Sequence, residues 1–284
     1  MNWKILYKSL FAILRVENNN AKVVGTGFVI NTNPIYILTC NHVVGESTED
    51  NDGVIKYSIT KRTDKLDEFD LRSAQISFIR AKKVCRKPEY DLAILEVDPS
   101  TNKDVAAQLN LESVKSLQLD LGKQARGIGA HVEWMSTGTL GDLTLTPRFF
   151  RGNLVASYTT NHNYEFIGPQ QAKQTQMMSG VKFLEIDQLF IPGSSGSPLL
   201  NSQSGRVIGY VHGFKSWPIM TNATINYPAE IQENSTNKNV KIKSQTPLVT
   251  SLSLAIDLQF IYSYLIENRF VSENFISKLK RILV

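Results

Sequence analysis

The chain has 284 residues, a net charge of +5, and 42% hydrophobic and 20% charged residues, a balance typical of a soluble globular protein. Its small basic excess is interspersed along the chain, so we expect no nucleic-acid partner. No stretch approaches about 18 uncharged apolar residues, which predicts no membrane-spanning helix and no membrane partner. The two cysteines and the lack of an export signal near the N-terminus favour a reducing, cytoplasmic location.

Short β-type runs separated by turn signals follow one another along the chain. They are rich in β-branched residues and regularly punctuated, which predicts an all-β sandwich or barrel. The runs expected to form strands are 11–18, 23–30, 35–39, 74–85, 92–97, 124–134, 144–147, 152–157, 182–187, 198–201, 206–214 and 250–256.

Helical patterns come at the end of the chain. Asp257 is a suitable N-cap for a helix over 258–269, whose apolar residues share one face. Residues 271–284 repeat the pattern as an amphipathic helix, which we expect to pack on its own domain. Residues 215–247 are polar and interrupted by prolines, so they are expected to form a long loop or insertion.

The segment "IPGSSGSPLLN", residues 191–201, places small turn formers directly before an apolar run. One interpretation is an ordinary surface loop before a strand. The other is a nucleophile turn, in which flanking glycines allow a bent backbone that exposes Ser195 and points amide N–H groups at a developing oxyanion. The second interpretation requires a base and an orienting carboxylate elsewhere in the chain.

Of the four histidines, His42 in "IYILTCNHVVGE" stands where a strongly apolar strand ends. His131 lies in a strand-like run and His162 in a polar loop, so structural roles suit both. Asp91 in "KPEYDLAILEV" directly precedes a core strand, and a buried aspartate needs a partner such as a histidine N–H.

Along the chain the three candidates come in the order His42, Asp91, Ser195. In this order on an all-β chain, their motifs resemble those of chymotrypsin-like serine peptidases, particularly the Deg-type (high-temperature-requirement) branch. The resembling segments are "GTGFVI", "ILTCNHVV", "YDLAILEV", "LEIDQLFIPGSSGSPLLNSQSGRVIGYVHG" and "SLSLAIDLQFIYSYLIEN". The resemblance covers about residues 10–270 and implies two six-stranded antiparallel β-barrels with a catalytic triad in the cleft between them. It implies a protease domain over 1–270, with barrels at about 10–110 and 120–256 and a closing helix at 257–269.

The resemblance also implies the role of each site residue. Ser195 is the expected nucleophile, His42 the general base and then acid, and Asp91 the carboxylate that orients His42. The N–H groups of Gly193 and Ser195 are the expected oxyanion hole. No metal and no cofactor is expected, and the substrate is a protein or peptide.

The chain departs from the family pattern at the nucleophile turn. Ser194 replaces the aspartate of digestive members, so activation by N-terminal cleavage is not expected, and Ser197 stands where glycine is usual. No segment resembles a PDZ domain.

The resemblance places the substrate-binding residues on both sides of the nucleophile. Leu189 lies six positions before Ser195, where trypsin-like enzymes carry the aspartate that binds Lys or Arg. An apolar P1 preference is therefore expected. The residues expected to contact substrate are Leu189, Phe190, Ile191, Val211, His212 and Gly213.

Three functions remain open from the sequence. The first is a serine endopeptidase, restrained by latency, a regulatory protein partner or narrow specificity, and by analogy serving bacterial stress response or defence. The second is a catalytically idle trypsin-like module that binds a partner peptide. The third is a nucleic-acid-binding β-barrel, against which stands the lack of an aromatic and basic stripe.

Overall fold

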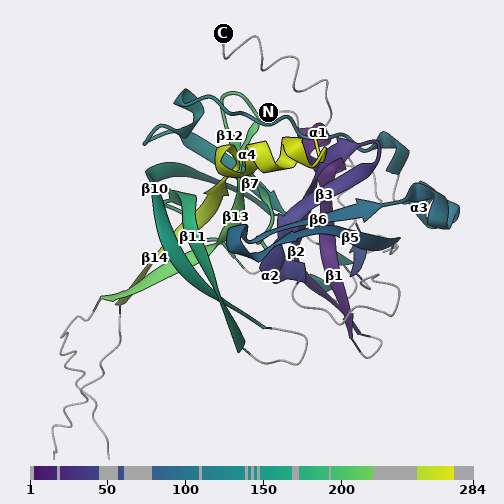
Figure 1. Ribbon diagram of the computed structural model, residues 1–284, viewed down its shortest axis with the longest axis horizontal. Coiled ribbons are helices and arrows are strands. Elements are labelled where there is room, and N and C mark those ends of the chain that lie inside the picture. The colour runs from purple at the N-terminus through teal and green to yellow at the C-terminus, as the bar shows by residue number, and fades with distance from the viewer. Residues whose placement is uncertain are drawn as a thin grey trace, which may run out of the picture.

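The computed structural model describes residues 3–17, 20–44, 57–60, 79–108, 111–137, 140–141, 144–145, 148–167, 173–191, 193–219 and 248–271. Their strands form two closed six-stranded antiparallel barrels, which confirms the predicted fold class. The two barrels lie side by side, the first coloured purple to blue and the second mainly teal to green (Figure 1).

The first barrel is built from the N-terminal third of the chain. Its strands in spatial order are β1 (Leu10–Glu17), β2 (Asn20–Thr32), β3 (Ile35–Cys40), β6 (Leu92–Val97), β5 (Ile79–Lys87) and β4 (Tyr57–Thr60), and β4 closes on β1. Nearly every residue of β3 and β6 is buried. These two strands therefore form the rigid part of the barrel from which the candidate site is built.

The second barrel carries the serine turn and follows the same closed order. Its strands are β10 (Arg148–Ile167), β11 (Lys173–Ile186), β14 (Leu248–Asp257), β13 (Val207–Ile219), β12 (Pro198–Asn201) and β7 (His131–Ser136). The short strands β8 (Leu140–Gly141) and β9 (Thr144–Leu145) pair separately. Trp134, fully buried, stacks on Phe150 in the core of this barrel.

Four α-helices are described: α1 (Trp3–Ser9), α2 (Asn41–Val44), α3 (Lys103–Gln108) and α4 (Leu258–Glu267). Asp257 caps α4, because its carboxylate accepts the Gln259 N–H at 2.9 Å, as the sequence predicts. Phe260 of α4 meets Tyr90, which leads into β6, edge to face at 5.1 Å. Since α4 also packs on β13 and β14, it links the two barrels (Figure 1).

Two strand pairs extend further than the sequence predicts. β10 and β11 pair from Leu154 opposite Ile186 out to Ile167 opposite Lys173, so His162 lies on a strand and not in a loop. β13 continues to Ile219, which pairs with Leu248. Residues 215–219 are therefore strand, whereas 220–247 lie outside the described residues, as does the helix expected at 271–284 apart from its first position.

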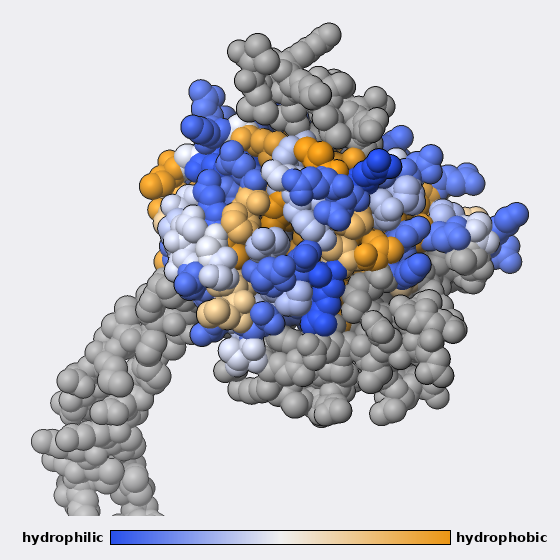
Figure 2. All heavy atoms as spheres, viewed as in Figure 1, coloured by the Kyte–Doolittle hydropathy of each residue, from blue (hydrophilic) through white to orange (hydrophobic). Residues whose placement is uncertain are grey.

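The described surface mixes polar and apolar side chains on the face shown in Figure 2. No helix in the described part of the chain is long and apolar enough to cross a membrane.

Candidate active site

The pairing of β3 with β6 brings His42 and Asp91 together. Cys40 at the end of β3 lies opposite Leu92 at the start of β6. Continuing this antiparallel register by one residue places Asn41 opposite Asp91, and the Asn41 N–H donates to the Asp91 carbonyl at 2.9 Å. His42 follows in the single turn of α2. Two residues that are 49 positions apart in the chain therefore meet at one end of a buried strand pair.

The Asp91 carboxylate is fully buried and holds His42 at two points. Its Oδ1 accepts the backbone N–H of His42 at 2.8 Å, and its Oδ2 lies 2.8 Å from His42 Nδ1. Asp91 adopts a left-handed backbone conformation with φ of 48° as it ends a short 3-10 helix. Aspartate tolerates this conformation better than most residues, at a cost of about 1–2 kcal/mol. The turn thus aims the carboxylate back at α2.

The surroundings of Asp91 keep its carboxyl group ionised. Burial opposes ionisation, but the charges and hydrogen bonds of His42 and His212 outweigh it and hold the Asp91 pKa well below its ordinary value. A carboxylate in contact with Nδ1 requires the proton of the neutral ring to sit on that nitrogen. His42 Nε2 is then the basic atom, in a side chain that is 20% exposed.

The serine turn is fixed against the first barrel. The Thr26 N–H of β2 donates to the Ser195 carbonyl at 2.8 Å. Gly196 has φ of 83°, and a Cβ there would lie 2.1 Å from the Thr26 carbonyl oxygen and 2.4 Å from Thr39 Oγ1. Only glycine fits this approach. The turn that carries Ser195 is therefore docked on the strands that lead to His42.

The groups that would act on a substrate are not engaged with one another. Within the described residues, Ser195 Oγ donates to the His212 carbonyl at 3.4 Å and not to His42. The N–H groups of Gly193 and Ser195 have no acceptor in the part of the chain that is described. The carbonyl of Gly193, whose φ is 89°, accepts the Thr26 hydroxyl at 2.8 Å, which fixes the Gly193–Ser194 peptide.

The residues predicted to bind substrate divide into exposed and buried sets. Leu189 is 54% exposed, whereas Phe190 is 8% exposed and meets Trp134 edge to face at 4.9 Å. Val211 is fully buried, and Ile191 and Gly213 are half-buried. The side chains of Phe190 and Val211 thus face the core, which leaves the exposed Leu189 and the main chain to meet a substrate.

His212 has a contact that the sequence reasoning missed. Its Nδ1 lies 2.6 Å from Asp91 Oδ2, and the ring is only 5% exposed. The sequence feature that could have indicated this contact is the position of His212 next to Val211 on β13. This strand is hydrogen-bonded to the serine turn, since the Gly196 N–H donates to the Val211 carbonyl. Thr26 was also missed, because its role depends on the docking of one barrel on the other.

One set of donors in this site matches metal ligands in type. Ligand atoms of Cys40, His42 and Asp91 lie within 4.8 Å of one another. However, the His42 and Asp91 atoms are already joined by a hydrogen bond, and burial, followed by the Asp91 charge, raises the pKa of the Cys40 thiol well above its ordinary value. These three side chains therefore fit a buried hydrogen-bonded cluster better than a metal site.

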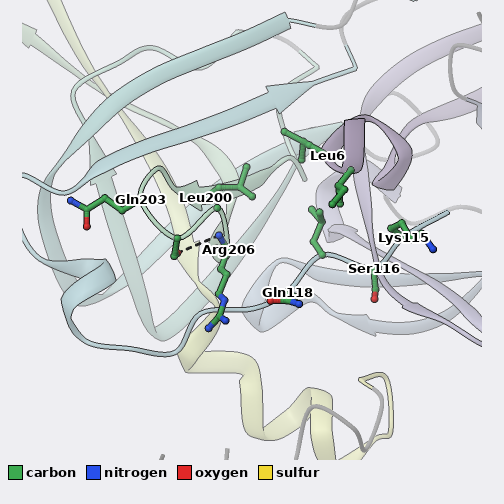
Figure 3. A pocket seen from close by; sticks show the side chains of 11 residues that line it. Leu6, Lys115, Ser116, Gln118, Leu200, Gln203 and Arg206 are labelled. Atoms are coloured by element: carbon green, nitrogen blue, oxygen red, sulfur yellow. Dashed lines mark hydrogen bonds between the residues drawn. The ribbon is translucent and has the colours of Figure 1, made fainter. Parts of the chain in front are cut away.

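A surface hollow of about 590 Å³ lies apart from these residues. It is bordered by α1, by the segment at Lys115 and Gln118, and by the turn at Gln203 and Arg206 (Figure 3). None of its lining residues is a predicted site residue, so the hollow is not where the proposed chemistry occurs.

A family comparison agrees with this fold. The trypsin-like peptidase domain family matches residues 25–209, which include most of β2, His42, Asp91 and the serine turn. The chain belongs to this family.

Curated relatives of the chain are described as DegP-like. A probable periplasmic serine endoprotease DegP-like of Pseudomonas fluorescens is 28% identical over 193 residues, which are 68% of this chain and 30% of the relative. A protein of the same description from Pseudomonas putida (strain W619) is 27% identical over 196 residues, 68% of this chain and 29% of the relative. The chain thus matches less than a third of the length of these relatives.

These names contradict the predicted cytoplasmic location, because the relatives are described as periplasmic. The prediction rested in part on the small number of cysteines. Cys40 and Cys85 are both free and buried, and two core thiols serve as small apolar side chains in any compartment. A low cysteine count was therefore a poor guide.

Solved structures resemble the fold of the whole chain. The Rv3671c protease from M. tuberculosis, active form, has a TM-score of 0.52 at 17% identity, covering 93% of this chain and 82% of that one. The MamO protease domain from Magnetospirillum magneticum, apo form, has a TM-score of 0.51 at 15% identity, covering 92% and 98%. At these identities the likeness concerns the fold.

Proposed function

We propose that the chain is a serine endopeptidase that cleaves peptide bonds through an acyl-enzyme. Ser195 Oγ attacks the scissile carbonyl while His42 Nε2 takes its proton, and the imidazolium then returns this proton to the leaving amine. Asp91 stays ionised and stabilises the imidazolium. The observation that carries the proposal is the double hold of Asp91 on His42, at the backbone N–H and at Nδ1, next to a serine turn docked on the same barrel.

The proposed oxyanion hole consists of the N–H groups of Gly193 and Ser195. Supporting this role, neither N–H has an acceptor within the described residues, and the Thr26 hydroxyl holds the carbonyl of the Gly193–Ser194 peptide that lies between them in the chain. Such a donor stabilises the transition state by about 3–4 kcal/mol.

The proposed substrate is an extended peptide with an apolar P1 side chain. The peptide would add as a strand to β13 beyond His212, in the β-augmentation mode. Leu189 is exposed and carries no charge at the position that selects P1, so a Lys or Arg there would lack a counter-charge.

The relatives suggest a setting for this activity. We propose a periplasmic peptidase with a single catalytic unit over residues 1–270, restrained by latency, a partner or narrow specificity. We propose stress response or defence as its biological role.

A second candidate function has one observation in its favour. Because Ser195 Oγ bonds the His212 carbonyl and not His42 among the described residues, the site also suits an idle module that binds a peptide without cleaving it. Bonds of this kind are often long in the absence of substrate and tighten when it binds.

Cleavage-site profiling of a complex protein mixture separates the two functions. The purified wild type and Ser195→Ala are incubated with the same mixture, and new peptide termini are identified. New termini with apolar P1 residues that require Ser195 are expected. A folded wild type that captures peptides but generates no termini beyond those of Ser195→Ala would favour the idle module.

A further inference from the structure

The Asp91 carboxylate meets two imidazole rings at the same oxygen. Asp91 Oδ2 lies 2.8 Å from His42 Nδ1 and 2.6 Å from His212 Nδ1. The ring centroids of the two histidines are 5.7 Å apart, with an interplanar angle of 84°. His212 is more deeply buried than His42, so this is a built contact of the fold and not an incidental surface pair.

Building on the proposed peptidase function, we propose that His212 is a positioning residue whose neutral ring secures Asp91 for His42 and whose protonation opposes proton uptake by His42. An ionised carboxylate accepts hydrogen bonds and donates none, so each Nδ1 carries a proton. With Oδ1 on the His42 backbone N–H, the carboxylate then accepts three donors. It is therefore held in one orientation.

The single negative charge of Asp91 contacts both imidazole rings, and for this reason the basicity of His42 depends on the protonation of His212. When His42 Nε2 takes the Ser195 proton, the imidazolium is neutralised by Asp91. If His212 already carries a proton, the same carboxylate faces two positive rings whose centroids are 5.7 Å apart. Like charges at this distance in a buried site disfavour the second proton. Protonated His212 thus weakens His42 as a base.

Among the other groups around His212, Tyr164 and Cys40 do not supply this charge change. Among the described residues, the titratable groups around His212 are Asp91 before β6, His42 on α2, His162 and Tyr164 on β10, and Cys40 on β3, whose Sγ bonds the carbonyl of the neighbouring Val211. Phe183 of β11 is the apolar neighbour. Burial, followed by the Asp91 charge, raises the pKa values of Tyr164 and Cys40, so both stay neutral while imidazoles titrate.

Two substitutions of His212 separate donation from titration. In His212→Asn, the amide nitrogen takes the place of Nδ1 and can still donate to Asp91, but it cannot be protonated near neutral pH. In His212→Ala the donor is lost. His131→Asn is the matched control, because His131 is exposed and its Nδ1 bonds Asn153.

The first readout is the pH profile of peptide hydrolysis. Near pH 8, His212→Asn should keep kcat within about threefold of wild type, whereas His212→Ala should lose roughly tenfold in kcat with little change in KM. Toward acid, kcat/KM of wild type and His131→Asn should fall in two separated one-proton steps, and that of His212→Asn in a single step. Equal acid limbs in wild type and His212→Asn would overturn the proposal.

The second readout does not depend on hydrolysis. Imidazole nitrogen NMR of the full chain should show that His42 and His212 titrate as a coupled pair in wild type, and that His42 titrates as a single group in His212→Asn. Independent titration in wild type would overturn the inference even if peptides are cleaved. Coupled titration without Ser195-dependent cleavage would instead overturn the proposed function, and with it the positioning role.

Discussion

The first barrel holds His42 and Asp91 in direct hydrogen-bond contact, whereas the second barrel presents Ser195 with its hydroxyl 3.4 Å from the His212 carbonyl oxygen. In the first barrel, register alone sets the contact, since β3 and β6 are adjacent strands. In the second, a turn must be held across the boundary between barrels, through Thr26 and Gly196. The proposed acid–base pair is therefore preorganised, whereas the placing of the proposed nucleophile depends on the docking of the turn and, in our proposal, on substrate.

The largest effect on kcat should come from breaking the contact between Asp91 and His42. Asp91→Asn is expected to lower kcat by about 10⁴-fold, because an amide that donates to His42 Nδ1 moves the ring proton to Nε2 and removes the base. Peptide hydrolysis under single-turnover conditions measures this. Asp98→Asn is the control, since Asp98 is an exposed carboxylate that caps the Ser100 N–H. A loss of under tenfold would show that another carboxylate orients His42.

In the second barrel, the largest effect on stability should come from Arg126. Its Nε lies 2.7 Å from Asp257 Oδ1, and both side chains are buried. Arg126→Ala should lower the free energy of unfolding by about 3 kcal/mol, because the Asp257 carboxylate loses its buried partner and keeps the more exposed Lys182, whose Nζ lies 3.1 Å from Oδ2. The measurement is urea denaturation.

Arg151→Ala tests the same change at the surface of this barrel. Arg151 pairs with Glu133 at 3.0 Å but is 71% exposed, so the expected cost is below about 1 kcal/mol. Equal costs at the two positions would show that burial does not set the strength of the Arg126 pair.

The docking of the serine turn can be tested with a pair of glycines. Gly196→Ala should destabilise the fold by more than about 2 kcal/mol and abolish serine reactivity, because strain at φ of 83° adds to a clash with the Thr26 carbonyl. Gly129→Ala has the same φ but no atom within 4 Å of the new Cβ, so it should cost only about 1 kcal/mol. If the two variants unfold alike, the contact between the turn and β2 is not what requires glycine.

A smaller effect is expected in substrate choice. Matched peptides with Leu, Val or Phe at P1 should exceed those with Lys or Arg in kcat/KM by about 10–200-fold, the range that one pocket contact provides. Preference for Lys or Arg would mean that an acidic residue outside the described part of the chain reaches the pocket.

The smallest effect concerns acid stability. Because the folded-state pKa of Asp91 is lowered despite burial, the ionised carboxylate stabilises the fold above the ordinary aspartate value of about 4. This contribution is lost as pH falls from that value toward the folded-state pKa, by up to roughly 1.4 kcal/mol per pH unit. The stability difference between wild type and Asp91→Asn should therefore narrow below pH 4. A difference that already narrows at pH 6 would contradict the lowered pKa.

Sequence reasoning succeeded where the information is local. The apolar runs of β3 and β6, with a histidine after one and an aspartate before the other, predict both strands and the candidate residues. The ends of β10 and β13 were missed because these segments are polar and paired as two-stranded extensions, which lack the alternating apolar pattern of a barrel wall. The ring contact of His212 could not be predicted, because it depends on how one barrel meets the other.

The most direct test of the account is covalent labelling of Ser195 with a fluorophosphonate probe, followed by peptide mass spectrometry. The probe reacts with a serine that an adjacent base has activated. The account predicts one label per chain, located on Ser195, absent from Ser195→Ala and formed far more slowly in Asp91→Asn. Labelling that persists in Ser195→Ala, or a folded wild type that stays unlabelled, would contradict it.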